Sequence, residues 1–169
     1  MHHRLVLLAL LLGPTTLQAQ QAAPTCAAVE HHQFDFWAGD WIVTDSSGTT
    51  NYGTNIVTQE EAGCLLHEHW TGSRGGTGQS LNFYDRVTGH WAQVWVDGSG
   101  TVLRLEGQRD GAAMRLEGDT RGADGRIVKN RIAWWPQPDG RVRQTWSVSQ
   151  DDGRTWQVSF DGWYRRRNS

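Results

Sequence analysis

The sequence predicts an all-β fold, an antiparallel up-and-down barrel of about ten strands with a short N-terminal helical plug. Three observations support this prediction. From Asp40 onward, apolar and polar residues alternate in short runs, turn sequences separate the runs, and no segment between them has the length and period of a helix. Strands are expected at 41–44, 55–59, 64–70, 80–84, 90–96, 102–107, 113–117, 127–135, 142–148 and 155–164.

Asp-Gly dipeptides mark many of the expected turns. Asp110-Gly111 and Asp139-Gly140 are examples, and their glycines supply the left-handed backbone that tight hairpins require. Such short connections leave no room for crossover helices, so the strands must follow one another up and down. Closing this meander removes its exposed edges, and a two-sheet sandwich is the alternative architecture. Residues 31–37 are expected to form the short helix that caps one end.

The first 19 residues have the features of a secretory signal peptide. Arg4 precedes an unbroken apolar run at 5–12, and Ala19 provides a small residue for cleavage. The run is shorter than the ~20 apolar residues that cross a bilayer as a helix. We therefore expect a periplasmic or secreted protein, without membrane insertion after cleavage. Its mature part would comprise an N-terminal segment at 20–33 and one barrel domain at 34–169.

Export determines how the two cysteines are interpreted. Cys26 and Cys64 form an even pair, and a disulfide is the natural expectation in an oxidising compartment. This bond would tie the N-terminal segment to the third strand. Two buried free thiols are the alternative.

Charge and aromatic content narrow the classes of partner. The formal net charge is −2, and Arg165-Arg166-Arg167 is the one basic run near the end of the barrel. Nucleic-acid-binding domains usually carry a basic face, so no nucleic-acid partner is expected. The ten tryptophans suit a thick β core or a cavity lined by rings.

The start of the first expected strand carries a family signature. Gly39-Asp40-Trp41 resembles the G-x-W motif of the lipocalin-like (calycin) superfamily. In that superfamily the tryptophan closes one end of the barrel beneath a basic residue from the last strand. The resemblance therefore implies that Arg165 or Arg166 lies over the indole of Trp41, within cation–π distance.

A longer resemblance covers most of the mature chain. The text at 34–41, 68–70, 80–85, 91–97 and 160–164 resembles an uncharacterised family of secreted bacterial lipocalin-like barrel proteins. The better known ten-stranded relatives, nitrobindins and fatty-acid-binding proteins, carry haem or lipid. Nitrobindin-like haem binding uses a histidine near the last strands, and no histidine follows His90. No cofactor is therefore expected.

His67-Glu68-His69 has the one metal-like spacing in the sequence. Residues two apart on a strand share a face, so His67 and His69 could bind a zinc ion with His90 as a third ligand. The opposite face of this strand carries Glu68 and Trp70, and a tryptophan is the better inward residue. The histidines would then face solvent, and no metal site is expected.

Polar and aromatic residues alternate along the expected strands and form rows across neighbouring strands. If the rows face inward, they line an aromatic cavity with a few hydrogen-bonding groups and one carboxylate, as small-molecule pockets do. A filled core in which neighbours satisfy each polar group is one alternative. The reverse phase, with Val94 and Val96 inside, is another. The expected ligand-binding residues are Glu68, Trp70, Ser80, Asn82, Tyr84, Trp91, Gln93, Trp95, Arg131, Gln144 and Trp146.

Three classes of function remain open. The first is binding of a small, partly aromatic or amphipathic molecule. The second is an enzyme in which Glu68 acts as general acid or base and Asn82, Gln93 or Arg131 stabilises an oxyanion. The third is a structural or interaction role in the cell envelope. A binding module would pair Glu68 with Arg131, whereas a solitary Glu68 among rings would have a raised pKa.

Overall fold

The chain folds into a closed antiparallel barrel. The computed structural model describes residues 26–122 and 124–167, so the expected signal peptide lies outside the described residues. Within that part of the chain, ten strands pair in sequence order and β1 pairs with β10, which confirms the predicted barrel and excludes the open sandwich. The strands are β1 (Gly39–Thr44), β2 (Asn51–Glu60), β3 (Leu65–Gly72), β4 (Thr77–Asp85), β5 (His90–Asp97), β6 (Val102–Asp110), β7 (Ala113–Arg121), β8 (Ile127–Pro136), β9 (Val142–Ser149) and β10 (Gln157–Arg166).

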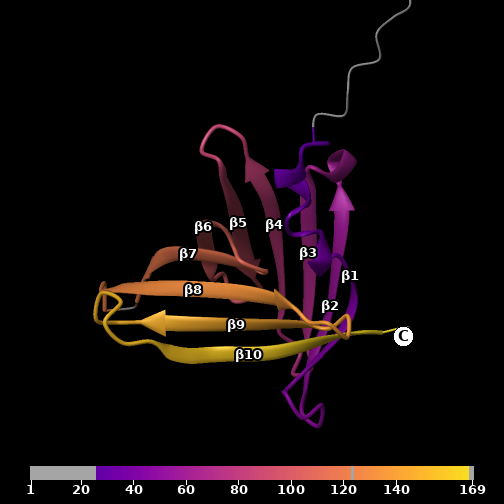
Figure 1. Cartoon of the computed structure of the whole chain (residues 1–169). Helices are drawn as coiled ribbons and strands as arrows, with labels where there is room; N and C mark the ends of the chain where they lie inside the picture. The colour runs from indigo at the N-terminus through magenta and orange to yellow at the C-terminus, as the bar shows by residue number, and fades with distance from the viewer. Residues whose placement is uncertain (1–25, 123, 168–169) are drawn as a thin grey trace, which may run out of the picture.

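Two groups of strands in the barrel cross each other. In Figure 1, β3 and β4 stand upright, whereas β8, β9 and β10 lie across them. Three short 3-10 helices accompany the strands: η1 (Val29–His32), η2 (Asp35–Trp37) and η3 (Glu61–Gly63). The expected plug at 31–37 is thus formed by η1 and η2 instead of one helix. No helix in the described ranges is long and apolar enough to cross a membrane.

The N-terminal segment is fastened to the barrel in two ways. Cys26 and Cys64 form a disulfide, which confirms the predicted bond and ties this segment to the residue preceding β3. The indole of Trp91 on β5 also donates a hydrogen bond of 3.1 Å to the carbonyl of Glu30. These attachments hold η1 and η2 across one end of the barrel.

Aromatic rings fill this closed end. Phe34 stacks on Trp37 with ring centroids 5.0 Å apart, and it meets Trp134 of β8 edge-on at the same separation. Trp41 is fully buried, and its indole nitrogen donates a 2.9 Å hydrogen bond to the carbonyl of Trp37. Aromatic rings therefore close this end of the barrel.

A cation covers Trp41, as the lipocalin-like resemblance implies. The guanidinium carbon of Arg166 lies 4.2 Å from the centre of the indole. Trp41 and Arg166 are register partners in β1 and β10, so barrel closure places the cation over the ring. Gly39 leaves the necessary space, because a Cβ there would overlap the guanidinium.

Candidate functional site

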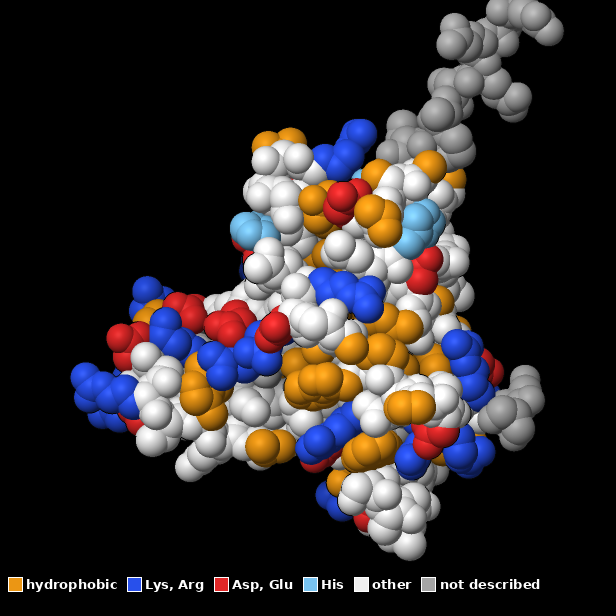
Figure 2. Space-filling view, in the orientation of Figure 1, with side chains coloured by type: hydrophobic (Ala, Val, Ile, Leu, Met, Phe, Trp, Pro, Cys, Tyr) orange, Lys and Arg blue, Asp and Glu red, His pale blue; other side chains and the backbone are white. Residues whose placement is uncertain are grey.

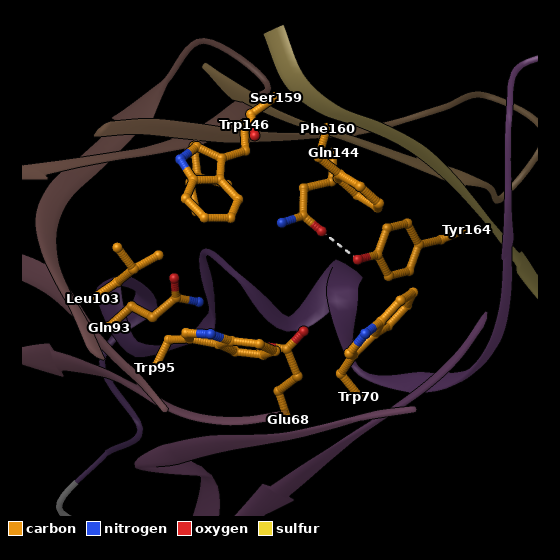
Figure 3. Close-up of a pocket in the computed structure, with 11 residues that line it drawn as sticks. Glu68, Trp70, Gln93, Trp95, Leu103, Gln144, Trp146, Ser159, Phe160 and Tyr164 are labelled. Carbon is orange, nitrogen blue, oxygen red and sulfur yellow. Dashed lines mark hydrogen bonds between the residues drawn. The ribbon is translucent and has the colours of Figure 1, made fainter. Parts of the chain in front are cut away.

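A cavity of about 250 Å³ lies inside the barrel and is partly open to solvent. Its volume is just below the ~300–1,000 Å³ of typical ligand pockets, which suits a small ligand. Figure 3 shows side chains from opposite walls surrounding this space. The lining residues are Glu68, Trp70, Gln93, Trp95, Leu103, Ile132, Gln144, Trp146, Ser159, Phe160 and Tyr164.

The phase of the strands places the polar and aromatic rows inside. On β5, Trp91 and Gln93 are buried, whereas Val96 is 47% exposed. On β4, Asn82 is buried and Leu81 is 43% exposed. The reverse phase, with Val94 and Val96 inside, is therefore wrong. Apolar residues such as Leu81 and Val96 face the outer side of these strands.

Three cavity rings lie over glycines, which lets bulky side chains surround a space without filling it. Trp95 covers Gly78 and Phe160 covers Gly162, and a Cβ at either glycine would overlap the ring above it. A Cβ at Gly53 would lie 2.9 Å from the ring of Trp70. The rings therefore lie partly in the space that side chains would take at these glycine positions.

An irregularity in β10 adds two lining residues. The pairing with β9 shifts register between Val158 and Phe160, and such a bulge re-aims side chains locally. Ser159 and Phe160 are neighbours in the chain, yet both line the cavity. The bulge thus lets one wall of the cavity present a hydroxyl beside a ring.

Glu68 supplies the carboxyl group of the cavity. It is 5% exposed, and its two oxygens accept hydrogen bonds from Asn55 Nδ2 at 2.9 Å and Ser80 Oγ at 2.5 Å. Burial disfavours the charged form and raises the pKa of Glu68 from 4.5 to about 7, although the two hydrogen bonds act in the opposite direction. Within residues 26–122 and 124–167, no Lys, Arg or His lies at salt-bridge distance from this carboxyl. Glu68 is therefore a buried acid with neutral partners.

A chain of hydrogen-bonded neutral groups extends from Ser80, the partner of Glu68, to Asn82 and Gln93. Ser80 Oγ accepts a 2.8 Å hydrogen bond from Asn82 Nδ2, whose oxygen accepts a 2.7 Å bond from Gln93 Nε2. Asn82 also donates to the carbonyl of Leu66 at 3.1 Å. Buried polar groups arranged in this way hold one another in fixed orientations. The network therefore fixes the position of the Glu68 carboxyl.

The opposite wall carries a second polar pair. The hydroxyl of Tyr164 donates a short hydrogen bond to Gln144 Oε1, which Figure 3 shows as a dashed line. Burial raises the pKa of Tyr164 well above 10, and the negative charge of nearby Glu68 acts in the same direction. Next to this pair, Trp146 donates to Asn130 Oδ1 at 3.0 Å. Tyr164 therefore stays neutral and available for hydrogen bonding across the physiological range of pH.

The structure separates the residues expected to bind a ligand into three groups. Ser80 and Asn82 are buried and hydrogen-bonded in the network behind Glu68. Tyr84 and Trp91 point inward but pack at the closed end, where Tyr84 meets His31 edge-on. The six that line the cavity are Glu68, Trp70, Gln93, Trp95, Gln144 and Trp146. Their part in binding remains a prediction.

Arg131 is the exception, because the structure places it on the outer wall. Its guanidinium lies 4.0 Å from the ring centre of Trp156 and donates a 2.7 Å hydrogen bond to Glu117. Its neighbours Asn130 and Ile132 take the inward positions of β8. The face of the molecule in Figure 2 likewise carries basic and acidic side chains interspersed. The expected inward orientation of Arg131 was therefore wrong, and Arg131 cannot pair with Glu68.

Five lining residues and one partner of Glu68 were not expected from the sequence. Asn55 is fully buried on β2 and carries the amide that contacts the carboxyl. Alternation was a usable signal for it, since Gly53, Asn55 and Val57 share the inward face of that strand. The missed lining residues are Leu103, Ile132, Ser159, Phe160 and Tyr164.

The histidines considered as metal ligands lie on the outer side of the barrel. The rings of His67 and His69 are 4.1 Å apart, so the two residues share a face as expected from their spacing. His67 contacts Glu60 at 3.2 Å and Gln79 at 3.1 Å, and His90 is exposed at the start of β5. No group of three or more metal-binding side chains occurs among the residues described.

The lipocalin-like resemblance is supported by the fold and by no match to a known protein. No model of a known protein family matches the chain, and no curated protein sequence matches it. The closed ten-strand antiparallel barrel is compatible with the fold of the calycin superfamily.

Proposed function

We propose that this chain is an exported, lipocalin-like carrier or sensor that binds a small molecule inside its barrel. The observation that carries the proposal is the cavity itself, in which three indoles and a phenyl ring surround two glutamines, a tyrosine hydroxyl and a carboxyl group. Rings with a few placed polar groups are the usual composition of ligand pockets.

The architecture supports the same function. The closed end is filled by the rings of Phe34, of Trp37 in η2 and of Trp134 in β8, whereas the cavity is partly open to solvent. The disulfide between Cys26 and Cys64 fits export, since such bonds persist in oxidising compartments.

Binding can be tested with the tryptophans of the cavity as reporters. Native mass spectrometry of protein purified from its source should detect a retained small molecule, and adding that molecule to stripped protein should quench tryptophan fluorescence. Trp95→Ala should weaken both signals. Trp156→Ala, which removes an indole from the outer wall, should leave the affinity unchanged. Protein that retains no molecule and shows no quenching with a broad library of small molecules would contradict the proposal.

An enzyme that uses the same cavity is the second candidate. One observation favours it: Glu68 has a pKa of about 7 and no cationic partner among the described residues, and general acids and bases often have such pKa values. Turnover of chromogenic esters or glycosides that disappears in Glu68→Gln would establish this function. Equal rates for Glu68→Gln and the unmodified protein would exclude Glu68 as the catalytic acid or base.

A further inference from the structure

The charge inside the cavity is unbalanced. Among the described residues that line the cavity, Glu68 is the one carboxylate, and none is a lysine, arginine or histidine. Its hydrogen-bond partners Asn55 and Ser80 are neutral. A carboxylate in such surroundings is stabilised most by a cation that enters the cavity. None of the described lining residues provides one, so a cationic ligand would supply the missing positive charge.

The rings around Glu68 are also suited to a cation. Figure 3 shows Trp95 and Trp70 on either side of the carboxyl group, with Trp146, Phe160 and Tyr164 across the open space. The faces of aromatic rings attract cations, at about 0.5–2 kcal/mol for each favourable contact, and indole is the strongest of the three ring types. Rings on several sides and one acidic group form the arrangement that recognises ammonium groups.

We infer that the ligand is a small organic cation, a quaternary ammonium ion or a protonated amine, whose charged nitrogen lies against Glu68 and among the rings of Trp70, Trp95 and Trp146. This inference rests on the proposed binding function and names its ligand class. The amides of Gln93 and Gln144 and the hydroxyl of Tyr164 line the same cavity. Each keeps hydrogen-bonding capacity for the ligand beyond its bond to Asn82 or to the other member of the pair. A volume of about 250 Å³ suits one aromatic or branched group attached to the charged nitrogen.

The same features argue against other ligand classes. A fatty acid or another carboxylate would bring a second negative charge next to Glu68, without any cation among the described lining residues to bind its head. Haem would bring its acidic side chains into the same surroundings. A wholly apolar ligand would cover the amides of Gln93 and Gln144 without using the hydrogen-bonding capacity that each amide keeps beyond its protein partners, which is costly in a buried site.

Binding of a cation should release a proton. The pKa of Glu68 is about 7 because burial disfavours its charge, and a cation bound beside it favours that charge. The groups that face the carboxyl from neighbouring β2 and β4 are the neutral Asn55 and Ser80. The titratable group nearby on β10 is Tyr164, whose pKa lies well above 10. Glu68 therefore dominates the pH dependence of binding.

Three probes with one carbon skeleton test the sign of the preferred charge. We suggest titrating the full mature protein at pH 8 with 2-phenylethylamine, 2-phenylethanol and phenylacetate, following tryptophan fluorescence. The amine should bind at least about tenfold more tightly than the alcohol, a difference of ~1.4 kcal/mol, and phenylacetate should bind most weakly. Alcohol or phenylacetate binding as tightly as the amine would overturn the inference and leave the binding function intact. Failure of all three to bind at millimolar concentration would also overturn it.

Benzyltrimethylammonium, whose charge does not titrate, isolates the contribution of the protein. The charged fraction of Glu68 falls from about 0.9 at pH 8 to about 0.01 at pH 5. The affinity for benzyltrimethylammonium should therefore fall over this range, by roughly 90-fold in the limit where protonated Glu68 does not bind the cation. Glu68→Gln should lose this dependence and the preference for the amine, while its affinity for 2-phenylethanol shows that the cavity is intact. Glu106→Gln, an exposed position on β6, is the matched control and should behave as the unmodified protein. A pH-independent affinity in the unmodified protein would refute the inference.

Discussion

Glu68 should make the stability of the ligand-free protein decrease with rising pH. The folded state raises the pKa of this carboxyl from 4.5 to about 7, so the folded protein holds a proton that the unfolded chain has already released. The resulting stability is fully present below pH 4.5 and is lost as pH rises through about 7. Integrating the linkage relation between pH 5 and pH 8 gives a loss of about 2.5 kcal/mol in the free energy of unfolding.

The surroundings of Glu68 can accommodate both charge states. The carboxylate accepts from Asn55 Nδ2 and from Ser80 Oγ. The amide oxygen of Asn55 is buried without a hydrogen-bond partner, and rotating this amide would turn that oxygen toward the carboxyl. It could then accept a hydrogen bond from protonated Glu68. For the same reason, glutamine should be tolerated at this position.

Urea unfolding of the unmodified protein and of Glu68→Gln at several pH values measures this effect. Other titrating groups contribute equally to both proteins, so the difference between the two free energies of unfolding isolates Glu68. The stability of Glu68→Gln relative to the unmodified protein should rise by about 2.5 kcal/mol between pH 5 and pH 8. A difference that stays within about 0.5 kcal/mol across this range, or changes in the opposite sense, would refute the reasoning.

Three further predictions concern the framework of the barrel. Unfolded, unreduced mature protein should contain no reactive thiol, and two titratable thiols per chain would contradict the bond. The disulfide Cys26–Cys64 closes a separation of 38 residues. Its reduction should lower the free energy of unfolding by about 4 kcal/mol on the chain-entropy estimate. Arg166→Ala should cost about 1 kcal/mol through loss of the contact with Trp41, and an unchanged urea midpoint would show that this contact contributes nothing. Gly78→Val should displace Trp95 and reduce ligand affinity more than tenfold in a folded protein. Gly76→Val, at a position with no neighbour within 4 Å and no left-handed backbone, should affect Trp95 and affinity far less. Equal effects of the two variants would argue against the placement of Trp95.

Alternation along single strands was sufficient to predict much of this structure. All ten expected strands occur, because each is bounded by turn residues and keeps a period of two. The inward phase of Gln93 and Trp95 followed from the cost of exposing several indoles. The inward face of β8 was predicted incorrectly because bulky residues occupy both of its faces, with Trp134 buried and Trp135 half-buried. Even so, Lys129 and Arg131 share one face of β8 and Ile132 and Trp134 the other, so the charged pair was a usable signal that Arg131 faces outward.

The remaining features depend on distances between strands, which one sequence does not contain. Tyr164 reaches the cavity because β10 closes the barrel against β1. The bulge that turns Ser159 inward is a shift in pairing and leaves no mark in the alternation. The contact between Trp95 and Gly78 likewise requires the register of β4 against β5, in which Trp95 pairs with Ser80.

The two ends of the barrel explain how a small protein can keep a polar cavity. At the closed end, Phe34, Trp37 and Trp134 are fully buried against one another, and burying each such ring removes roughly 150–250 Å² from water. In the other half, burial of Glu68 costs stability above neutral pH, since its neighbours are neutral. A chain selected for stability alone would replace that carboxyl by an aliphatic group of similar volume. The stabilisation concentrated at the closed end lets the cavity keep an acid whose negative charge a bound cation would stabilise.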